Sequence, residues 1–288
     1  MVLLLLILAH LTADFLMQSN QMVKEKLKYL NPHIFHHFLV AGVSLVIIWG
    51  YQYHFQNILM HFLLPLAFII FTHYLIDISK IKISSRYQGR AASDMRPLAV
   101  FLLDQGLHLA VILTAGILFF NITAESIRLF FENGFSTSLN FPETIVFIVI
   151  VYILATTVSG VIVKHIIGTI PSSLANFEGE MTLQSRKNAE KGKKIAEIEN
   201  SFTEAHHYFT YSTPIRSRGR YIGYLERLLV IILTVSGAYE AIAFIIAAKA
   251  IARFKQLNDR NWAEYFLLGT LSSIFLAVIL GILVRQIL

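Results

Sequence analysis

Long apolar segments recur along this chain, and they constrain its fold more than any other feature. A helix needs about 20 mainly apolar residues to cross a lipid bilayer. Segments of roughly this length and character occupy 2–18, 34–53, 57–79, 97–120, 142–167, 222–252 and 262–287. Because backbone polar groups in lipid must be satisfied within the chain, each segment is expected to be helical. The sequence therefore predicts an all-α fold, a polytopic transmembrane helix bundle of about seven spans.

Composition supports a membrane protein and excludes several other classes. Of 288 residues, 56% are hydrophobic and 15% are charged, and the mean hydropathy is +0.62. A net charge of +6 is expected to reflect basic loops at a lipid surface. The sequence has no basic stripe with interleaved aromatic residues of the kind that binds nucleic acid. The absence of cysteine excludes disulfides and thiolate metal sites. Any metal ion must therefore be held by nitrogen and oxygen ligands.

Two of the apolar segments are unusual in length. The segment 2–18 is short, but it lacks the basic start and the cleavage site of a signal peptide, so it is interpreted as a retained first span. The segment 222–252 would reach about 45 Å as one straight helix. Ser236 and Gly237 lie in its middle, so one tilted helix, a broken hairpin and a re-entrant segment all remain open.

Loops rich in lysine and arginine alternate along the chain with loops that have few of them, and this alternation predicts an orientation. The basic loops are 19–33, 80–96 and 168–220, whereas 53–57 has no Lys or Arg and 121–141 has one. Because cytoplasmic loops carry the excess of positive charge, we expect these three loops in the cytoplasm and the N-terminus outside.

The same pattern suggests a division of the chain into parts. The expected parts are a four-helix membrane module at 1–120, an external segment and fifth span at 121–167, a cytoplasmic insertion at 168–220 and C-terminal membrane helices at 221–288. The insertion is the one sizeable segment outside the membrane, and it is a candidate surface for a protein partner.

Three histidine–aspartate pairs lie inside the apolar segments at a spacing of four. They are His10 with Asp14, His73 with Asp77, and Asp104 with His108. That spacing places both side chains on one helix face. Ionisable groups in lipid are costly and usually mark function. The expected orientation puts all three pairs at similar depth on the cytoplasmic side, which predicts one polar site.

A further histidine from the segment 34–53 is expected to join this site. His36 and His37 are adjacent and point to different faces, and the small neighbour Ala41 favours His37. Other histidines are expected to be peripheral, in loops or at the membrane interface: His33, His54, His61, His206 and His207.

Imidazole and carboxylate groups together suit a divalent metal ion such as Zn or Mn, and carboxylate-rich sites shift the preference toward Mg. The expected metal ligands are His10, Asp14, His37, His73 and Asp77. Asp104 is expected to act as a general base or bridging ligand, with His108 as a catalytic residue or further ligand. The alternative is a hydrogen-bonded polar network that fixes helix packing without a ligand.

The C-terminal third carries cations within or beside apolar helix. Arg227, Lys249 and Arg253 could bind a phosphate, because guanidinium and ammonium groups suit that anion. Alternatively they extend to the membrane interface and pair with Glu226 or Glu264.

Several motifs occur in order: HLTADFLMQ at 10–18, HYLIDISK at 73–80 and FLLDQGLHL at 101–109. With a histidine at 36–37, they resemble an uncharacterised bacterial membrane-protein family, a domain of unknown function, over residues 1–120. That family is similar in style to membrane-bound metal-dependent hydrolases. The resemblance implies that the three pairs are the family's polar positions, flanked by Gln18, Lys80 and Gln105. It also implies that the protein lies in a bacterial inner membrane.

The sequence favours a metal-dependent hydrolase with a cytoplasm-facing intramembrane site. An amphiphilic or lipid phosphoester is the expected substrate, because the site lies near the headgroup level and basic residues surround it. One alternative is a metal-ion or proton transporter that uses the same residues. Another is a membrane scaffold or sensor whose polar cluster is structural. The expected partner common to all three is the lipid bilayer, and the sequence leaves the oligomeric state open.

Overall fold

The computed structural model describes residues 1–86, 96–123, 125, 128, 139–168, 216–258 and 260–287. Every regular element in this part of the chain is a helix, and no strand occurs in it. The predicted all-α fold is confirmed there. Most of the predicted insertion at 168–220, with its suggested partner surface and with His206 and His207, lies outside the described residues.

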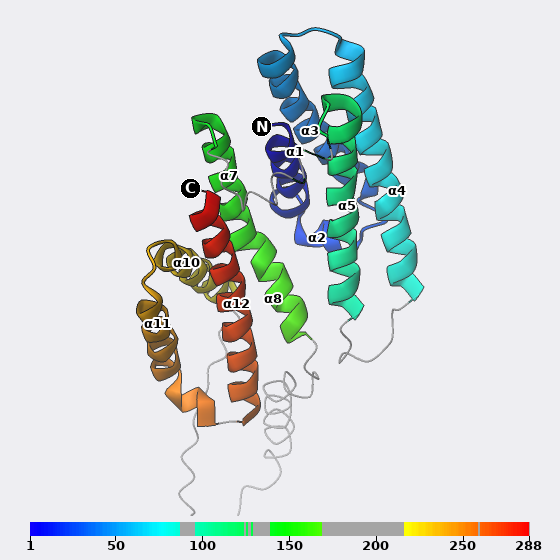
Figure 1. Ribbon diagram of the computed structural model, residues 1–288. Helices are drawn as coiled ribbons and strands as arrows, with labels where there is room; N and C mark the ends of the chain where they lie inside the picture. Colours follow the sequence, from blue (N-terminus) through cyan, green and yellow to red (C-terminus); the bar gives the residue numbers. More distant parts are fainter. Residues whose placement is uncertain are drawn as a thin grey trace, which may run out of the picture.

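The N-terminal half forms a group of helices around α3, α4 and α5 (Figure 1). Its elements are α1 (Val2–Leu11), the π-turn η1 (Thr12–Leu16), α2 (Asn20–Lys24), α3 (Leu30–Tyr53), the π-turn η2 (Leu59–Leu63), α4 (Leu64–Arg86) and α5 (Arg96–Phe120). The helix α1 contacts both α3 and α5, so it closes the group on one side.

The C-terminal half forms a second group beside the first. Its elements are α7 (Phe141–Ile153), the π-turn η3 (Leu154–Val158), α8 (Ser159–Ile167), α10 (Arg216–Val235), α11 (Tyr239–Ala252), the 3-10 turn η6 (Phe254–Asn258) and α12 (Arg260–Ile287). The two groups meet where α1 contacts α7, in an apolar cluster that includes Leu11, Ile150 and Ile153.

Five helices are long and apolar enough to cross a membrane: Leu30–Tyr53, Leu59–Ile83, Pro97–Phe120, Phe141–Ile167 and Trp262–Ile287. They coincide closely with five of the predicted spans. The predicted first span is the shorter apolar helix Val2–Leu16. The predicted total of about seven is therefore not reached by these criteria within the described residues.

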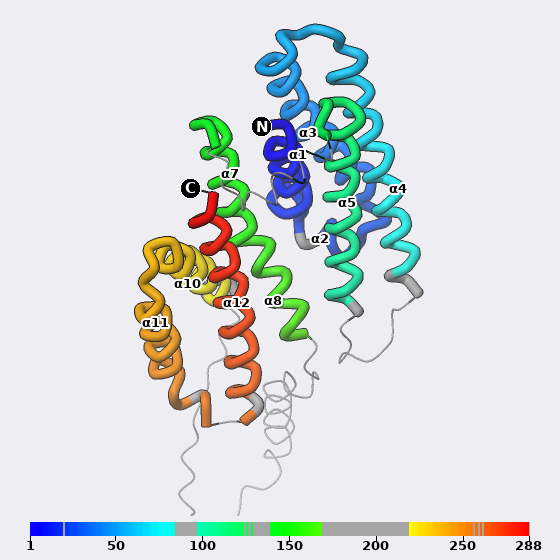
Figure 2. The backbone as a smooth tube through the Cα atoms, viewed as in Figure 1, coloured from blue at the N-terminus to red at the C-terminus, as the bar shows by residue number. Residues whose placement is uncertain are grey.

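The long segment 222–252 is broken rather than straight. The chain leaves α10 after Val235 and starts α11 at Tyr239, and Gly237 adopts the left-handed conformation with φ of 73°. Glycine reaches that conformation without steric cost, which explains a sharp reversal at this position. Figure 2 shows α10 and α11 as two separate helices joined by a tight turn. The structure thus excludes one straight helix over this segment and has two helices joined by a turn.

The outer surface of the helices is apolar, as a bilayer requires. On α3, for example, Leu39, Val43 and Ile47 are each 45% to 54% exposed. On α5, Leu103 and Leu107 are exposed as well. Water would disfavour so much uncovered apolar surface, whereas lipid tails cover it. Several apolar helices with apolar exteriors are typical of a multi-pass membrane protein.

The long helices of the N-terminal half run alternately in opposite directions, so the polar residues of each helix can be placed relative to two common ends. At one end of the bundle lie α2, the end of α4 and the start of α5, and this end is called the basic end here because Lys24, Lys28, Lys80 and Lys82 lie there. The opposite end holds the α3–α4 connection and the N-terminal amine, which pairs with Glu143 at 2.6 Å.

Candidate metal centre

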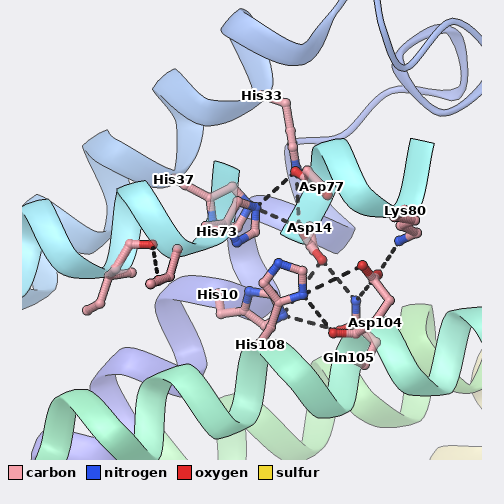
Figure 3. A network of polar contacts seen from close by, with 12 residues as sticks. His10, Asp14, His33, His37, His73, Asp77, Lys80, Asp104, Gln105 and His108 are labelled. Atoms are coloured by element: carbon pink, nitrogen blue, oxygen red, sulfur yellow. Dashed lines mark hydrogen bonds and ion pairs between the residues drawn. The ribbon is translucent and has the colours of Figure 1, made fainter. Parts of the chain in front are cut away.

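Four segments of the N-terminal half bring their histidines and aspartates together in the half of the bundle nearer the basic end (Figure 3). The group is called the His/Asp centre, and its members are His10, Asp14, His33, His37, His73, Asp77, Asp104 and His108. Six of the eight residues are buried, and His10 and Asp14 are nearly so. All six side chains of the three predicted pairs, together with His37, lie in this group.

Asp14 connects three helices at the centre. Its Oδ1 lies 2.9 Å from His37 Nε2 and 3.3 Å from His33 Nε2, both on α3. Its Oδ2 accepts a hydrogen bond from Gln105 Nε2 on α5 at 3.0 Å. Asp14 belongs to the π-turn η1 rather than to α1 proper. A π-turn inserts an extra residue into a helix and redirects the side chains that follow, and such turns are frequent at functional sites.

One set of donors could hold a single ion. In what we call the first ligand group, each of Asp14, His33, His37 and His73 offers an atom within 4.8 Å of the others. His33 Nε2 also lies 3.4 Å from Asp77 Oδ2. Metal–ligand bonds of about 2.0–2.2 Å place the ligands of one ion about 3–3.5 Å from one another. The spacings from Asp14 to His37 and to His33, 2.9 Å and 3.3 Å, are of that size.

A second set of donors adjoins the first. The second ligand group consists of His73, Asp77 and His108, so His73 belongs to both groups. His73 Nε2 and Asp77 Oδ2 are 3.2 Å apart but are not aligned as a hydrogen bond. Both atoms, and His108 Nε2, are buried without a hydrogen-bond partner among the described residues. Buried polar atoms are nearly always paired, and these three atoms lie close enough together that they could hold one cation.

The orientation of His108 fits this role. Its Nδ1 donates a hydrogen bond to the backbone carbonyl of Asp104 at 2.8 Å. The proton therefore sits on Nδ1, and the lone pair of Nε2 faces the second ligand group. Metal-binding histidines are commonly held in this way, with the other nitrogen bonded to a carbonyl or carboxylate.

Asp104 and His10 lie beside the ligand groups rather than within them. Asp104 Oδ2 is paired with the ammonium group of Lys80, whereas its Oδ1 is buried without a hydrogen-bond partner among the described residues. His10 Nε2 lies 3.2 Å from Gln105 Oε1 and 3.6 Å from Asp14 Oδ2. Its ring stacks on that of His108 at 4.9 Å. The predicted role of His10 as a metal ligand stays a prediction, since its place also suits positioning of Asp14 through Gln105.

The expectation that His33 is peripheral is wrong. Its side chain is 6% exposed, and it belongs to the first ligand group. The missed signal was its spacing: His33 and His37 are four apart on α3, the same spacing as in the three predicted pairs. By contrast, His61 lies at the opposite end of the bundle, where it stacks on Tyr53 and faces the carbonyl of Phe119.

A small cavity adjoins the centre on its apolar side. Its volume is about 20 Å³, and four of its lining residues are His10, His37, His73 and His108. A cavity of that size has room for about one water molecule. The remaining lining residues, such as Leu6 and Ile112, are apolar.

The three predicted phosphate-binding cations lie in the other half of the molecule. Arg227 donates hydrogen bonds to the carbonyls of Ala155 and Thr156 in the π-turn η3 and to Ser273 Oγ on α12. Lys249 pairs with Glu226 at 2.7 Å, and Arg253 follows the end of α11. Figure 1 shows α10 and α11 beyond α12 as seen from α5. Phosphate binding by these cations stays a prediction.

Comparison with known proteins places the centre within one matched segment. A family model described as "Protein of unknown function (DUF3307)" matches residues 2–136. No curated protein and no solved structure matches the chain. The matched segment holds every residue of the His/Asp centre, from His10 to His108. Residues 2–136 of this chain are thus similar to a family of unknown function, as the ordered motifs had indicated.

Proposed function

We propose that this protein is a membrane-embedded, metal-dependent hydrolase whose His/Asp centre holds a divalent cation and activates water at a phosphoester of an amphiphile or lipid. One observation carries the proposal. Buried donors from four helices converge on one place, and several of their atoms have no hydrogen-bond partner among the described residues. A polar network that only fixed helix packing would be expected to satisfy its own members.

The donor set narrows the identity of the ion. The first ligand group has three imidazoles and one carboxylate, and the second has two imidazoles and one carboxylate. Imidazole suits Zn²⁺, Mn²⁺ and Fe²⁺, whereas Mg²⁺ prefers oxygen ligands. We therefore favour Zn²⁺ or Mn²⁺ over Mg²⁺ as the cofactor.

The chain offers separate groups for binding and for proton transfer. A divalent ion lowers the pKa of a bound water and polarises the scissile group. Asp104 adjoins the second ligand group through His108 and has one carboxylate oxygen without a partner among the described residues. That oxygen is suited to accept a proton from the attacking water. Lys80 holds the other oxygen of Asp104 and so fixes the carboxylate.

Transport across the membrane is less well supported. The buried cluster of the N-terminal half includes Leu5, Leu45, Ile69 and Ile112. On each helix these residues lie between the His/Asp centre and the end opposite the basic end. An ion path through the N-terminal half would have to cross these buried apolar side chains. In the proposed orientation the basic end faces the cytoplasm of a bacterial cell.

The test uses detergent-purified protein loaded with Zn²⁺ or Mn²⁺. Short-chain phosphatidic acid and pyrophosphate are supplied, and released phosphate is measured alongside the metal content by mass spectrometry. Chelation should abolish turnover. Asp104→Asn should lower kcat by about 10²-fold or more while the ion is retained. Glu25→Gln, which changes an exposed carboxylate near the basic end, is the matched control.

Three outcomes would contradict the proposal. If the purified protein binds no divalent ion, the assignment of a metal centre is refuted. Full turnover by the Asp104→Asn variant would refute the assignment of Asp104 as the general base. Metal flux into proteoliposomes without hydrolysis would favour transport instead.

A further inference from the structure

The side chain of Gln105 lies between two carboxylates to which the proposed function gives different roles. Gln105 is on α5, and its amide is directed toward the His/Asp centre (Figure 3). Its Nε2 lies 3.0 Å from Asp14 Oδ2 and 3.2 Å from Asp104 Oδ2. Its Oε1 lies 3.2 Å from His10 Nε2. One neutral amide therefore contacts an expected metal ligand, the assigned base and a histidine.

The two carboxylates fix the orientation of this amide. An NH2 group has two protons and donates one to each carboxylate, whereas a carbonyl oxygen in the same place would be repelled by both. The carbonyl oxygen of Gln105 must then face His10. Because that oxygen only accepts hydrogen bonds, the proton of the neutral His10 ring belongs on Nε2.

The proton on His10 Nε2 bears on the role of this histidine. A ring nitrogen that carries a proton has no lone pair for a metal ion. The second neighbour of this nitrogen, Asp14 Oδ2 at 3.6 Å, is also an acceptor and favours the same tautomer. His10 belongs to neither ligand group. Its Nε2 therefore holds the amide of Gln105 in place and is not available to the ion.

The amide also distinguishes the two oxygens of each carboxylate. Asp14 Oδ2 accepts from Gln105, and Asp14 Oδ1 faces the histidines of the first ligand group. Asp104 Oδ2 accepts from Gln105 and from Lys80. Asp104 Oδ1 is buried without a hydrogen-bond partner in the described part of the chain. Each carboxylate is thus held at Oδ2 and presents Oδ1 to the centre.

We propose that Gln105 is a positioning residue that orients the metal ligand Asp14 and the base Asp104 together, and that His10 supports Gln105 and does not bind the ion. The inference rests on the proposed function for the roles of the two carboxylates. Hydrogen-bond partners of metal ligands orient those ligands and tune the affinity for the ion. Here one side chain performs this task for the ligand and for the base.

The first test measures metal affinity by competition with a chromophoric chelator in detergent. Gln105→Met keeps the length of the side chain but removes its hydrogen bonds to three residues. It should weaken binding by about 10–100-fold. Gln21→Met replaces an exposed glutamine on α2 and should change the affinity less than about twofold. Wild-type affinity in a Gln105→Met protein that unfolds at the wild-type temperature would overturn the proposal.

A double variant tests the role assigned to His10. His10→Phe keeps an aromatic ring against that of His108. If His10 acts through Gln105, the His10→Phe/Gln105→Met protein should bind the ion within about twofold as tightly as Gln105→Met alone. Losses that multiply in the double variant would make His10 a ligand in its own right and overturn the assignment.

Turnover gives a readout that a loss of packing would not move in the same way. Gln105→Met saturated with metal should show a kcat lowered at least about tenfold and a KM changed less than about twofold. The reason is that the amide holds Asp104 and not the substrate. A raised KM with the wild-type kcat would overturn the assignment of Gln105 as a positioning residue for the base.

The hydrogen bonds can also be tested without metal and without turnover. Nitrogen chemical shifts of isotope-labelled histidine in ion-free protein report which ring nitrogen of His10 carries the proton. The proton should be on Nε2 in the wild type and less so in Gln105→Met. A proton on Nδ1 in the wild type would overturn the proposal. If the protein binds no ion, the proposed function fails, and this measurement still decides whether Gln105 holds His10.

Discussion

Removal of His73 should abolish tight metal binding, because this side chain belongs to both ligand groups. Structural zinc sites of four ligands bind with about 10–16 kcal/mol. Shared equally among the ligands, loss of one imidazole costs about 2.5–4 kcal/mol. That range corresponds to a loss of affinity of about 10²–10³-fold. His73→Ala is therefore expected to weaken binding by this factor, whichever group holds the ion.

The assay is a competition between protein and a chromophoric chelator, with Zn²⁺ and with Mn²⁺, in detergent. His36→Ala is the matched control, since His36 is adjacent to His37 on α3 but belongs to neither ligand group. Circular dichroism and thermal unfolding are followed for both variants to detect loss of the fold. A His73→Ala protein that is folded and binds the ion as tightly as wild type would refute the assignment of the centre. Equal losses in His36→Ala would also refute it.

Three further predictions concern neighbouring features. His33→Ala should weaken metal binding by about as much as His37→Ala. Unchanged binding in the same chelator competition would indicate that His33 contributes to helix packing and not to metal binding. Acidification should weaken binding of the ion, because protons compete for the ring nitrogens. The same chelator competition at a series of pH values measures the affinity, and an affinity that does not fall with pH would argue against imidazole ligands. Arg227→Leu should remove the donor for two carbonyls and one hydroxyl. The cost is about 3 kcal/mol, which lowers Tm by about 6–12 °C in a chain of this size, and a Tm within about 2 °C of wild type would contradict the buried anchor.

Much of this fold is predictable because its controlling signals are local. Five predicted spans match helices to within a few residues, because a run of apolar residues of this length is typical of a membrane-spanning helix. The three pairs at a spacing of four are also local, and helical geometry alone places each pair on one face. Their meeting at one depth could be inferred from loop charges, because alternate helices run in opposite directions.

Features that depend on tertiary contacts were harder to predict. The break at Gly237 could be located, but whether the chain reversed there depended on the packing of α10 and α11 against their neighbours. The π-turn that carries Asp14 leaves no recognisable mark in the sequence.

The shared position of His73 limits how many ions the centre can hold. A neutral imidazole has one lone pair available for a metal, because its other nitrogen carries a proton. Two ions could use His73 together only if it lost that proton as well, which a buried ring beside two carboxylates does not favour. The two ligand groups therefore describe alternative positions of one ion about a common ligand. Asp14 and Asp77 would then serve as the carboxylates at either position, and one ion per chain is the expected stoichiometry.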